Sequence, residues 1–418
     1  MTFEPQREDE VRVLGFQWSP PAHDVKDYLA RNRVPYTWSD VEEEPAAREE
    51  AERLGAGDDD YPVVIFPDGT HLFAPDDEQL AGKIGLSTEA DRPFYDLIVV
   101  GGGPAGLAAA VYGASEGLRT VVFERVAPGG QAGMSAAIEN YLGFPEGLSG
   151  ADLAQRSVAQ ARRFGVEIVA ARSVTALRED GHYRVVELDD GSECWGHTVL
   201  LATGAAWRTL DAPGCNSLIG RGVYYGAASA ESLSFRGKDV YLLGGGNSAG
   251  QAAVHLARFA RSVTLLSVEE SLETSMSEYL LQRIRQTPNI HVRPCCTVAG
   301  VEGEGRLERL AIENVTTGEK ETVPANGLFV FIGAAPETEW LAGTVALDGE
   351  GYILSGAAAA REGEARWRRG RAPAPLETSL PGVFAAGDAR AGSVKRIGAA
   401  VGEGSSAVQY IHAYLRER

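Results

Sequence analysis

The pattern of apolar and polar segments is clearest between residues 96 and 125. Four apolar residues, Leu97 to Val100, predict a buried strand, and the Ala-rich run that extends to Gly117 predicts a helix. A second buried strand is expected over Thr120 to Phe123. Strand, helix and strand in this order form the repeating unit of a doubly wound parallel sheet, so an α/β fold is expected.

The same pattern returns from Asp239, where DVYLLGGGNSAGQAAVHLARFARSVTLL again gives strand, glycine-rich turn, helix and strand. Between the two copies lies a β-rich stretch that closes on an apolar strand ending in Ala202-Thr203-Gly204. Another apolar strand, Phe329 to Gly333, completes the second copy, and the Ala/Arg-rich stretch 357–375 is expected to be an exposed loop. The chain therefore predicts two Rossmann-like units.

Residues 11–85 form a separate module ahead of the first unit. Strand and helix patterns alternate up to about Leu54, and the second strand is expected to span YTWSDVEEE. Two further strands and a final helix from Asp76 follow. This βαβα-ββα order is typical of a thioredoxin-like domain.

Composition narrows the class of protein. With 44% hydrophobic and 23% charged residues, the chain is expected to be globular. The net charge of −19 argues against a nucleic acid or an anionic membrane as partner. There is no apolar run of about 18 residues, and the N-terminus is polar and acidic, so neither a membrane span nor a signal peptide is expected and the cytoplasm is the expected location. The four cysteines lack metal-ligand spacing, so no metal site is expected.

The glycines after the first strand form a dinucleotide fingerprint in its required context. Gly101 permits the tight turn, Gly103 lets the backbone approach a pyrophosphate, and Gly106 allows close packing of helix and strand. The pyrophosphate is then expected at the helix N-terminus, where free N–H groups favour an anion. Glu124, at the end of the second strand, is placed to accept hydrogen bonds from a ribose.

In combination, these motifs resemble those of low-molecular-weight thioredoxin reductases over residues 95–418. The resemblance implies FAD on the first unit, a nicotinamide nucleotide on the second, and a homodimer. It also implies an FAD domain that is interrupted by the nucleotide domain. The expected domains are a degenerate glutaredoxin-like domain over 1–86, FAD-binding parts over 94–208 and 336–418, and an NAD(P)-binding domain over 209–335.

The resemblance assigns residues to FAD position by position. Where the family has Arg-Gln-Ala facing the flavin, this chain has Lys395-Arg396-Ile397, so the flavin surroundings are expected to differ. The residues expected to bind FAD are Gly101, Gly103, Pro104, Ala105, Gly106, Glu124, Arg125, Gly130, Gln131, Asn140, Thr203, Gly204, Gly387, Asp388, Lys395, Arg396 and Ile397.

The second fingerprint is expected to bind NADH or NADPH, through Gly244, Gly246, Asn247, Ser248, Gly250 and Glu269. Relatives that use NADPH carry basic residues after the second strand of this unit, to bind the 2′-phosphate. Here that strand is followed by Ser267-Val268-Glu269-Glu270, and two carboxylates would repel a phosphate. NADH is therefore favoured over NADPH.

Both thiol motifs expected from the resemblances are missing. The family's Cys-Ala-Thr-Cys is replaced by Gly226-Ala227-Ala228-Ser229, and a dithiol relay needs two sulfur atoms. The N-terminal module resembles glutaredoxins, the mycoredoxin branch in particular, and Pro62 matches their cis-proline. Its thiol motif is replaced by Trp18-Ser19-Pro20-Pro21-Ala22-His23, so an interaction or dimer-stabilising role, or vestigial packing, is expected rather than redox chemistry.

The remaining cysteines do not supply a substitute relay. The vicinal pair Cys295-Cys296 is expected in a strand, where neighbouring side chains point to opposite faces. Cys194 and Cys215 stand alone and are expected to be inert.

These residues predict an FAD-dependent oxidoreductase that passes a hydride from a nicotinamide to the flavin and on to an acceptor other than thioredoxin. Tyr224, Tyr225 and Ser229 are candidates to line an acceptor pocket, with simple replacement packing as the favoured alternative. Two alternatives stay open. One is a flavin oxidase or dehydrogenase of a small molecule, and the other is a flavin-bound sensor or scaffold whose N-terminal module docks a partner.

Overall fold

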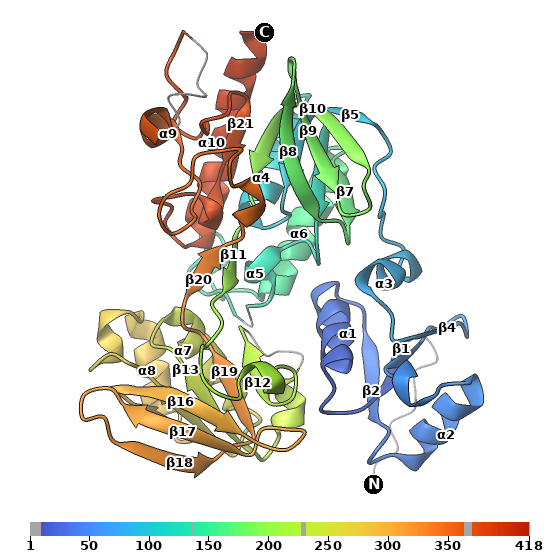
Figure 1. Ribbon diagram of the computed structural model, residues 1–418, viewed down its shortest axis with the longest axis vertical. Helices are drawn as coiled ribbons and strands as arrows, with labels where there is room; N and C mark the ends of the chain where they lie inside the picture. The colour runs from blue at the N-terminus through green and yellow to red at the C-terminus, as the bar shows by residue number, and fades with distance from the viewer. Residues whose placement is uncertain (1–9, 136, 227–230, 363–369, 418) are drawn as a thin grey trace. The chain divides into compact units, whose positions relative to one another are not determined.

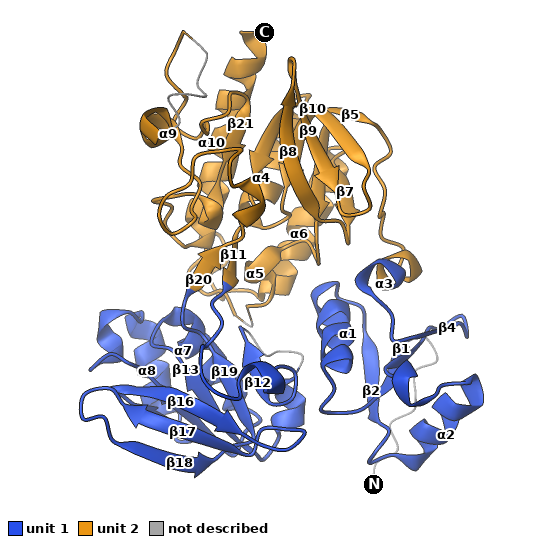
Figure 2. Cartoon of the chain, in the orientation of Figure 1, with its two compact units in different colours: residues 1–79, 207–333 blue, residues 80–206, 334–418 orange. Residues whose placement is uncertain are grey.

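The computed structural model describes residues 10–135, 137–226, 231–362 and 370–417. It divides the chain into two compact units, coloured separately in Figure 2. Unit 1 comprises residues 1–79 and 207–333, and unit 2 comprises residues 80–206 and 334–418. No helix among the described residues is long and apolar enough to cross a membrane.

Unit 2 is built on a seven-stranded sheet in the order β7-β6-β5-β10-β9-β8, with β21 paired to β10 (Figure 1). Its strands are β5 (Phe94–Val100), β6 (Thr120–Glu124), β7 (Glu167–Ala170), β8 (Val174–Asp180), β9 (Tyr183–Leu188), β10 (Glu193–Leu201) and β21 (Val383–Ala385). The pairs β5–β6, β6–β7, β5–β10 and β10–β21 are parallel, whereas β8–β9 and β9–β10 are antiparallel. The predicted α/β class with Rossmann-like sheets is confirmed.

The helices of unit 2 are α4 (Pro104–Ser115), α5 (Gly130–Gly133), α6 (Gly150–Arg163), α9 (Gly356–Glu362) and α10 (Ile397–Arg416). Helices α4 and α10 pack together with one face of the sheet in a single core cluster. Their approach is close at Gly404, where an added Cβ would lie 2.0 Å from the Ala105 carbonyl oxygen. This packing fixes the N-terminus of α4 at the end of the first strand.

The nucleotide-type part of unit 1 contains a five-stranded parallel sheet in the order β12-β19-β13-β14-β15. Its strands are β12 (Val223–Tyr225), β13 (Asp239–Leu243), β14 (Ser262–Leu266), β15 (Ile290–Arg293) and β19 (Gly327–Val330), with helices α7 (Asn247–Leu256) and α8 (Glu278–Gln286). A second, antiparallel sheet holds β16 (Cys296–Glu302), β17 (Arg309–Asn314) and β18 (Lys320–Pro324). The short strands β11 (Ala205–Trp207) and β20 (Ala334–Pro336) pair where the chain passes between the units.

The N-terminal module has the element order βαβα-ββα. It contains β1 (Val11–Gly15), α1 (Pro20–Arg31), β2 (Tyr36–Asp40), α2 (Pro45–Leu54), β3 (Val63–Ile65), β4 (His71–Phe73) and α3 (Asp77–Lys83), the last of which crosses the unit boundary. Its sheet order is β2-β1-β3-β4, with β1 parallel to β2 and antiparallel to β3. The Tyr61–Pro62 peptide bond is cis, as predicted.

Three local expectations were wrong. Strand β2 ends at Asp40 rather than continuing through the acidic residues, because the chain turns and Glu44 N donates to Asp40 O. Residues 356–362 form α9, so the stretch expected to be a loop begins as a helix, and residues 363–369 lie outside the described residues. Cys295 lies between β15 and β16 with φ 53°, in a turn rather than inside a strand.

Candidate functional site

The first glycine loop leaves the sheet at the carboxyl ends of three parallel strands. Val100 pairs with Phe123 on one side and with Leu201 on the other, so the next residues, Gly101 and Glu124 among them, gather at one edge. Gly101 has φ 103°, and an added Cβ would lie 2.3 Å from the Ala202 carbonyl oxygen. Only glycine fits this turn without a shift of the backbone.

The loop then feeds directly into α4. An added Cβ at Gly106 would lie 1.9 Å from the Gly101 carbonyl oxygen, so helix and loop are in contact. Gly103, the residue before the helix, is extended and has open space where a Cβ would stand. The structure therefore separates two needs for glycine: packing at Gly101 and Gly106, and access to the backbone at Gly103.

Glu124 lies beside this loop. Its Oε2 accepts a hydrogen bond from Gly102 N at 2.7 Å, and its Oε1 accepts one from Val126 N at 3.0 Å. Burial raises the pKa of Glu124, and the backbone hydrogen bonds oppose that rise. The carboxylate is thus held at the glycine loop by backbone N–H groups.

Other residues expected around FAD come from separate segments of unit 2. Thr203, after β10, has a buried hydroxyl without a hydrogen-bond partner among the described residues. A buried hydroxyl of this kind fits a polar ligand that would complete it. Gln131 and Asn140 are exposed and available, whereas Arg125 is paired with Glu337 at 2.9 Å.

The segment around Asp388 is held by an ion pair that the sequence did not reveal. Glu403, on α10, accepts from Gly387 N at 2.8 Å and pairs with Arg390 at 2.5 Å. Lys395 donates to the Asp388 carbonyl oxygen at 2.6 Å. Burial raises the pKa of the Asp388 carboxyl. In the sequence, Glu403 could have been identified as an acidic residue in the predicted helix that follows the Gly387-Asp388 motif.

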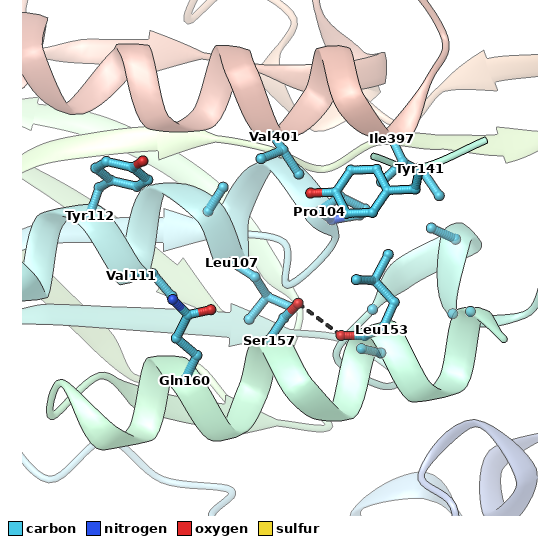
Figure 3. Close-up of a pocket in the computed structure, with 16 residues that line it drawn as sticks. Pro104, Leu107, Val111, Tyr112, Tyr141, Leu153, Ser157, Gln160, Ile397 and Val401 are labelled. Atoms are coloured by element: carbon cyan, nitrogen blue, oxygen red, sulfur yellow. Dashed lines mark hydrogen bonds between the residues drawn. The ribbon is translucent and has the colours of Figure 1, made fainter. Parts of the chain in front are cut away.

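A pocket of about 130 Å³ lies between α4, α6 and the start of α10 (Figure 3). Figure 3 shows Tyr141 beside Pro104 and Ile397, while α6 contributes Leu153 and Ser157 and, near Val111, Gln160. The hydroxyl of Ser157 is used within its own helix, donating to the Leu153 carbonyl oxygen at 2.8 Å. Two of the lining residues, Pro104 and Ile397, belong to the expected FAD set, so the pocket adjoins that site.

The second glycine loop, in unit 1, repeats this geometry. Leu243 pairs with Leu266 and Val330, so Gly244 and its neighbours gather at the carboxyl edge of the sheet. An added Cβ at Gly244, which has φ 146°, would lie 2.5 Å from the Phe331 carbonyl oxygen. Gly246, before α7, is extended and has open space at its Cβ position, as at Gly103.

Glu269 is the counterpart of Glu124. Its Oε2 accepts hydrogen bonds from the hydroxyls of Thr274 and, at 2.8 Å, Ser275. The Ser275 hydroxyl also lies 3.0 Å from the Gly245 carbonyl oxygen, which keeps the carboxylate beside the loop. These hydroxyl donors lower the pKa of Glu269. Thr274 and Ser275 were not predicted from the sequence. Two neighbouring hydroxyl residues shortly after an acidic residue in a loop could have indicated them.

The third fingerprint position differs between the loops. Counting from Gly244 as from Gly101, the equivalent of Gly106 is Ala249, which is fully buried. Gly250 packs instead under Met276, whose sulfur would lie 2.8 Å from an added Cβ. Asn247 accepts a hydrogen bond from Ser277 N at 2.8 Å, and Ser248 is exposed. The structure thus gives Gly250 a packing role between α7 and the segment leading into α8.

The two described candidates for an acceptor pocket, Tyr224 and Tyr225, both take part in packing. Tyr224 is 4% exposed and stacks on Phe329 with ring centroids 5.3 Å apart. The hydroxyl of Tyr225 accepts from Leu210 N at 3.1 Å. Ser229 lies outside the described residues. Both tyrosines therefore serve the packing of unit 1.

Gly226 faces a side chain that leaves no room for a larger residue. It has φ 86°, and an added Cβ would lie 2.3 Å from Nε1 of Trp207. The Trp207 ring in turn packs edge-on against Phe331 at 5.4 Å. Trp207 was not predicted as a site residue, because a single tryptophan after a predicted strand gives no indication of its partner in the fold.

All four cysteines are free. Burial raises the pKa of Cys194 to about 12 and also raises the pKa of Cys215. Cys295 N donates to the Glu269 carbonyl oxygen at 3.1 Å, and Cys296 N donates to that of Ser267 at 2.8 Å. The vicinal pair thus supports the segment after β14. No group of three or more His, Cys, Asp or Glu side chains within the described part of the chain is arranged to hold a metal ion.

Comparison with known proteins identifies the family. The family model described as pyridine nucleotide-disulphide oxidoreductase matches residues 95–404. The F component of alkyl hydroperoxide reductase from Pseudomonas putida is 36% identical over 342 residues, which cover 79% of this chain and 61% of that protein. This chain therefore spans less than two thirds of that relative.

Thioredoxin reductases are similar over their whole length. That of Mycolicibacterium smegmatis is 34% identical over 327 residues, covering 78% of this chain and 98% of that protein. The crystal structure of Lactococcus lactis thioredoxin reductase, in its FR conformation, has a TM-score of 0.70 and 30% identity, covering 78% of this chain and 100% of that chain. The chain belongs to the pyridine nucleotide-disulphide oxidoreductase family, FAD-dependent oxidoreductases for which NAD(P)H is the expected second nucleotide.

Proposed function

We propose that this protein is an NAD(P)H oxidoreductase that passes a hydride from the nicotinamide to FAD and on to an acceptor other than thioredoxin. One observation carries the proposal: in both loops a glycine with positive φ ends the strand, an extended glycine with open space precedes the helix, and a carboxylate is fixed beside the loop. Two such loops in one chain fit two dinucleotides.

FAD is assigned to unit 2. The N-terminus of α4 would hold the pyrophosphate through its free N–H groups, and Glu124 would accept hydrogen bonds from the ribose. Thr203 would contribute its buried hydroxyl. Asp388, whose carbonyl oxygen accepts a hydrogen bond from Lys395, would contribute its carboxyl group. When bound, FAD supplies the two-electron chemistry, while the chain supplies binding and orientation.

NADH is assigned to unit 1 in preference to NADPH. Glu269 is held by two hydroxyl donors and lies beside Gly245, where it can accept hydrogen bonds from a ribose. A 2′-phosphate at that place would face a carboxylate with a lowered pKa, which repels it. Glu270, the next residue, adds a second negative charge.

The acceptor is proposed to be something other than thioredoxin because the chain has no cysteine pair with Cys-x-x-Cys spacing. Cys194 and Cys215 are buried thiols with raised pKa values, and only a thiolate exchanges readily with a disulfide. The reaction is therefore drawn as direct transfer from reduced FAD to the acceptor, without a protein dithiol.

Anaerobic stopped-flow mixing of the FAD-loaded protein with NADH, and separately with NADPH, tests this function. Rapid loss of the visible absorbance of oxidised flavin with NADH, and slower loss with NADPH, is expected. Equal rates would contradict the nucleotide preference alone. Loss of absorbance with neither would contradict the reductase proposal and favour a dehydrogenase that draws electrons from a small molecule.

A further inference from the structure

Within unit 1, helix α1 of the N-terminal module packs against the nucleotide-type part. An added Cβ at Gly220 would lie 3.0 Å from the Pro20 Cα atom, so the two backbones are in direct contact. Trp18, just before the helix, packs edge-on against Phe235 with ring centroids 6.3 Å apart. Lys238 Nζ lies over the Trp18 ring, 5.0 Å from its centroid.

A buried cluster of charges lies in the same interface. Lys26 Nζ, on α1, lies 2.9 Å from Glu231 Oε1, and His23 Nδ1 lies 2.9 Å from the same oxygen. The side chains of Lys26 and Glu231 are 3% and 1% exposed. Lys26 also stands over the ring of Trp38, 4.5 Å from its centroid. Every charged partner of Glu231 in this cluster therefore comes from the N-terminal module.

The two buried charges of the cluster compensate each other across the interface. A charge removed from water is costly unless a partner of opposite sign meets it. Burial raises the pKa of Glu231, but the hydrogen bond from His23 and the charge of Lys26 outweigh burial and hold the pKa below its usual range. Removing either partner would leave the other charge buried in the interface without a counter-charge, which is strongly destabilising.

The interface lies where both thiol motifs are missing. Its α1 side follows Ser19, in the segment that replaces the thiol motif of glutaredoxins. Its other side includes Glu231, five positions after Gly226, in the segment that follows the lost Cys-x-x-Cys. Tyr224, whose ring centroid lies 5.0 Å from that of His23, and Glu231 therefore bring the residues on both sides of the lost Cys-x-x-Cys to the segment that replaces the glutaredoxin motif.

We propose that the N-terminal module is a fixed internal cap, whose former thiol face has the chain's own nucleotide-binding part as its partner. The Lys26–Glu231–His23 cluster clamps the two together. The module therefore neither shuttles electrons nor offers this face to an outside dithiol or glutathione. This inference does not depend on the nucleotide or the acceptor that the flavin site uses.

A pair of introduced cysteines tests the docking in the full chain. In a Cys295→Ser background, Pro20→Cys and Gly220→Cys would place their Cβ atoms about 3.4 Å apart, close to the range of a disulfide. A disulfide is expected to form in air in most molecules, seen as loss of free thiols that a reductant restores.

The matched control combines Pro20→Cys with Gly237→Cys. Gly237 has the same φ of 72° as Gly220, but an added Cβ there meets nothing within 4 Å. This pair is expected to stay reduced. Two reactive thiols in the Gly220 pair, or equal closure in both pairs, would overturn the proposal.

One further substitution tests the role of the charge cluster. Adding Glu231→Gln to the Gly220 pair is expected to slow disulfide closure about tenfold, because the clamp loses its buried charge pair; an unchanged rate would overturn the role of the cluster.

Discussion

The Ser275 hydroxyl donates to Glu269 at 2.8 Å and also lies 3.0 Å from the Gly245 carbonyl oxygen, so one hydroxyl fixes the carboxylate to the glycine loop. The first prediction follows from this contact. Glu269→Arg should lower kcat/KM for NADH about tenfold and raise it for NADPH, because a cation replaces the ribose acceptor and attracts the 2′-phosphate. Steady-state rates with both nucleotides measure the change.

Glu270→Arg is the matched control, since Glu270 is exposed and next in sequence. It should shift the preference much less. Equal shifts in the two variants would show that net charge, rather than the fixed position of Glu269, sets the choice of nucleotide.

A second prediction separates folding from FAD binding in the first loop. Gly101→Ala should destabilise the protein by roughly 3 kcal/mol or more, because its Cβ meets the Ala202 carbonyl oxygen. Gly103→Ala should change the free energy of unfolding by no more than about 1 kcal/mol, yet lower the FAD content, because its Cβ enters the space needed by the pyrophosphate. Chemical denaturation and the flavin-to-protein ratio report the two effects. Full FAD content in Gly103→Ala would contradict the assignment.

Restoring cysteines should not restore a relay. Gly226→Cys combined with Ser229→Cys should yield no NADH-dependent reduction of thioredoxin, and Gly226→Cys alone should destabilise the chain by about 2 kcal/mol or more. The physical reason is the positive φ of Gly226 and the indole of Trp207 above it. Trp207→Ala should recover part of that loss. Turnover by the cysteine pair in the presence of Trp207 would refute this account.

The Glu403–Arg390 pair predicts a dependence of stability on pH. Burial raises the pKa of Glu403, but Arg390 and the Gly387 N–H outweigh burial and lower it overall. A lowered native pKa means that the contribution is complete above the unfolded value of about 4.3 and is lost as the pH falls through the native value. Between about pH 5 and pH 3, the wild type should therefore lose more free energy of unfolding than Glu403→Gln.

Denaturation curves at each pH measure this difference, and Arg390→Gln provides the reciprocal test. If the carboxylate acts through Arg390, this variant should flatten the same part of the profile. Parallel profiles for the wild type and Glu403→Gln would contradict the coupling.

The parts of the fold that sequence predicted are those set by local patterns. The strands before Gly101 and Gly244, the helices after them and the position of Glu124 each depend on residues within one βαβ unit. Even there, the spacing of the glycines did not predict that Gly250 packs under Met276, because spacing alone does not distinguish a turn glycine from a packing glycine.

The features that sequence missed depend on residues far apart in the chain. Lys26 and Glu231 are separated by 205 positions, and the sequence around either residue does not predict their contact. Cys295 was expected in a strand because its neighbours are strand-like, whereas its φ of 53° is set by contacts with the segment after β14. The close approach of Trp207 to Gly226 likewise arises only when β11 and β12 are brought together.

The contact between Lys26 and Glu231 joins two parts of a single polypeptide, and this lowers the affinity that the contact needs to keep the two parts together. Two groups tied by a chain meet at an effective concentration of roughly millimolar or more, so a modest intrinsic affinity is enough to keep them together. Because both parts belong to one chain, the interface can be small and partly charged. The module is also inherited together with the domain that it covers.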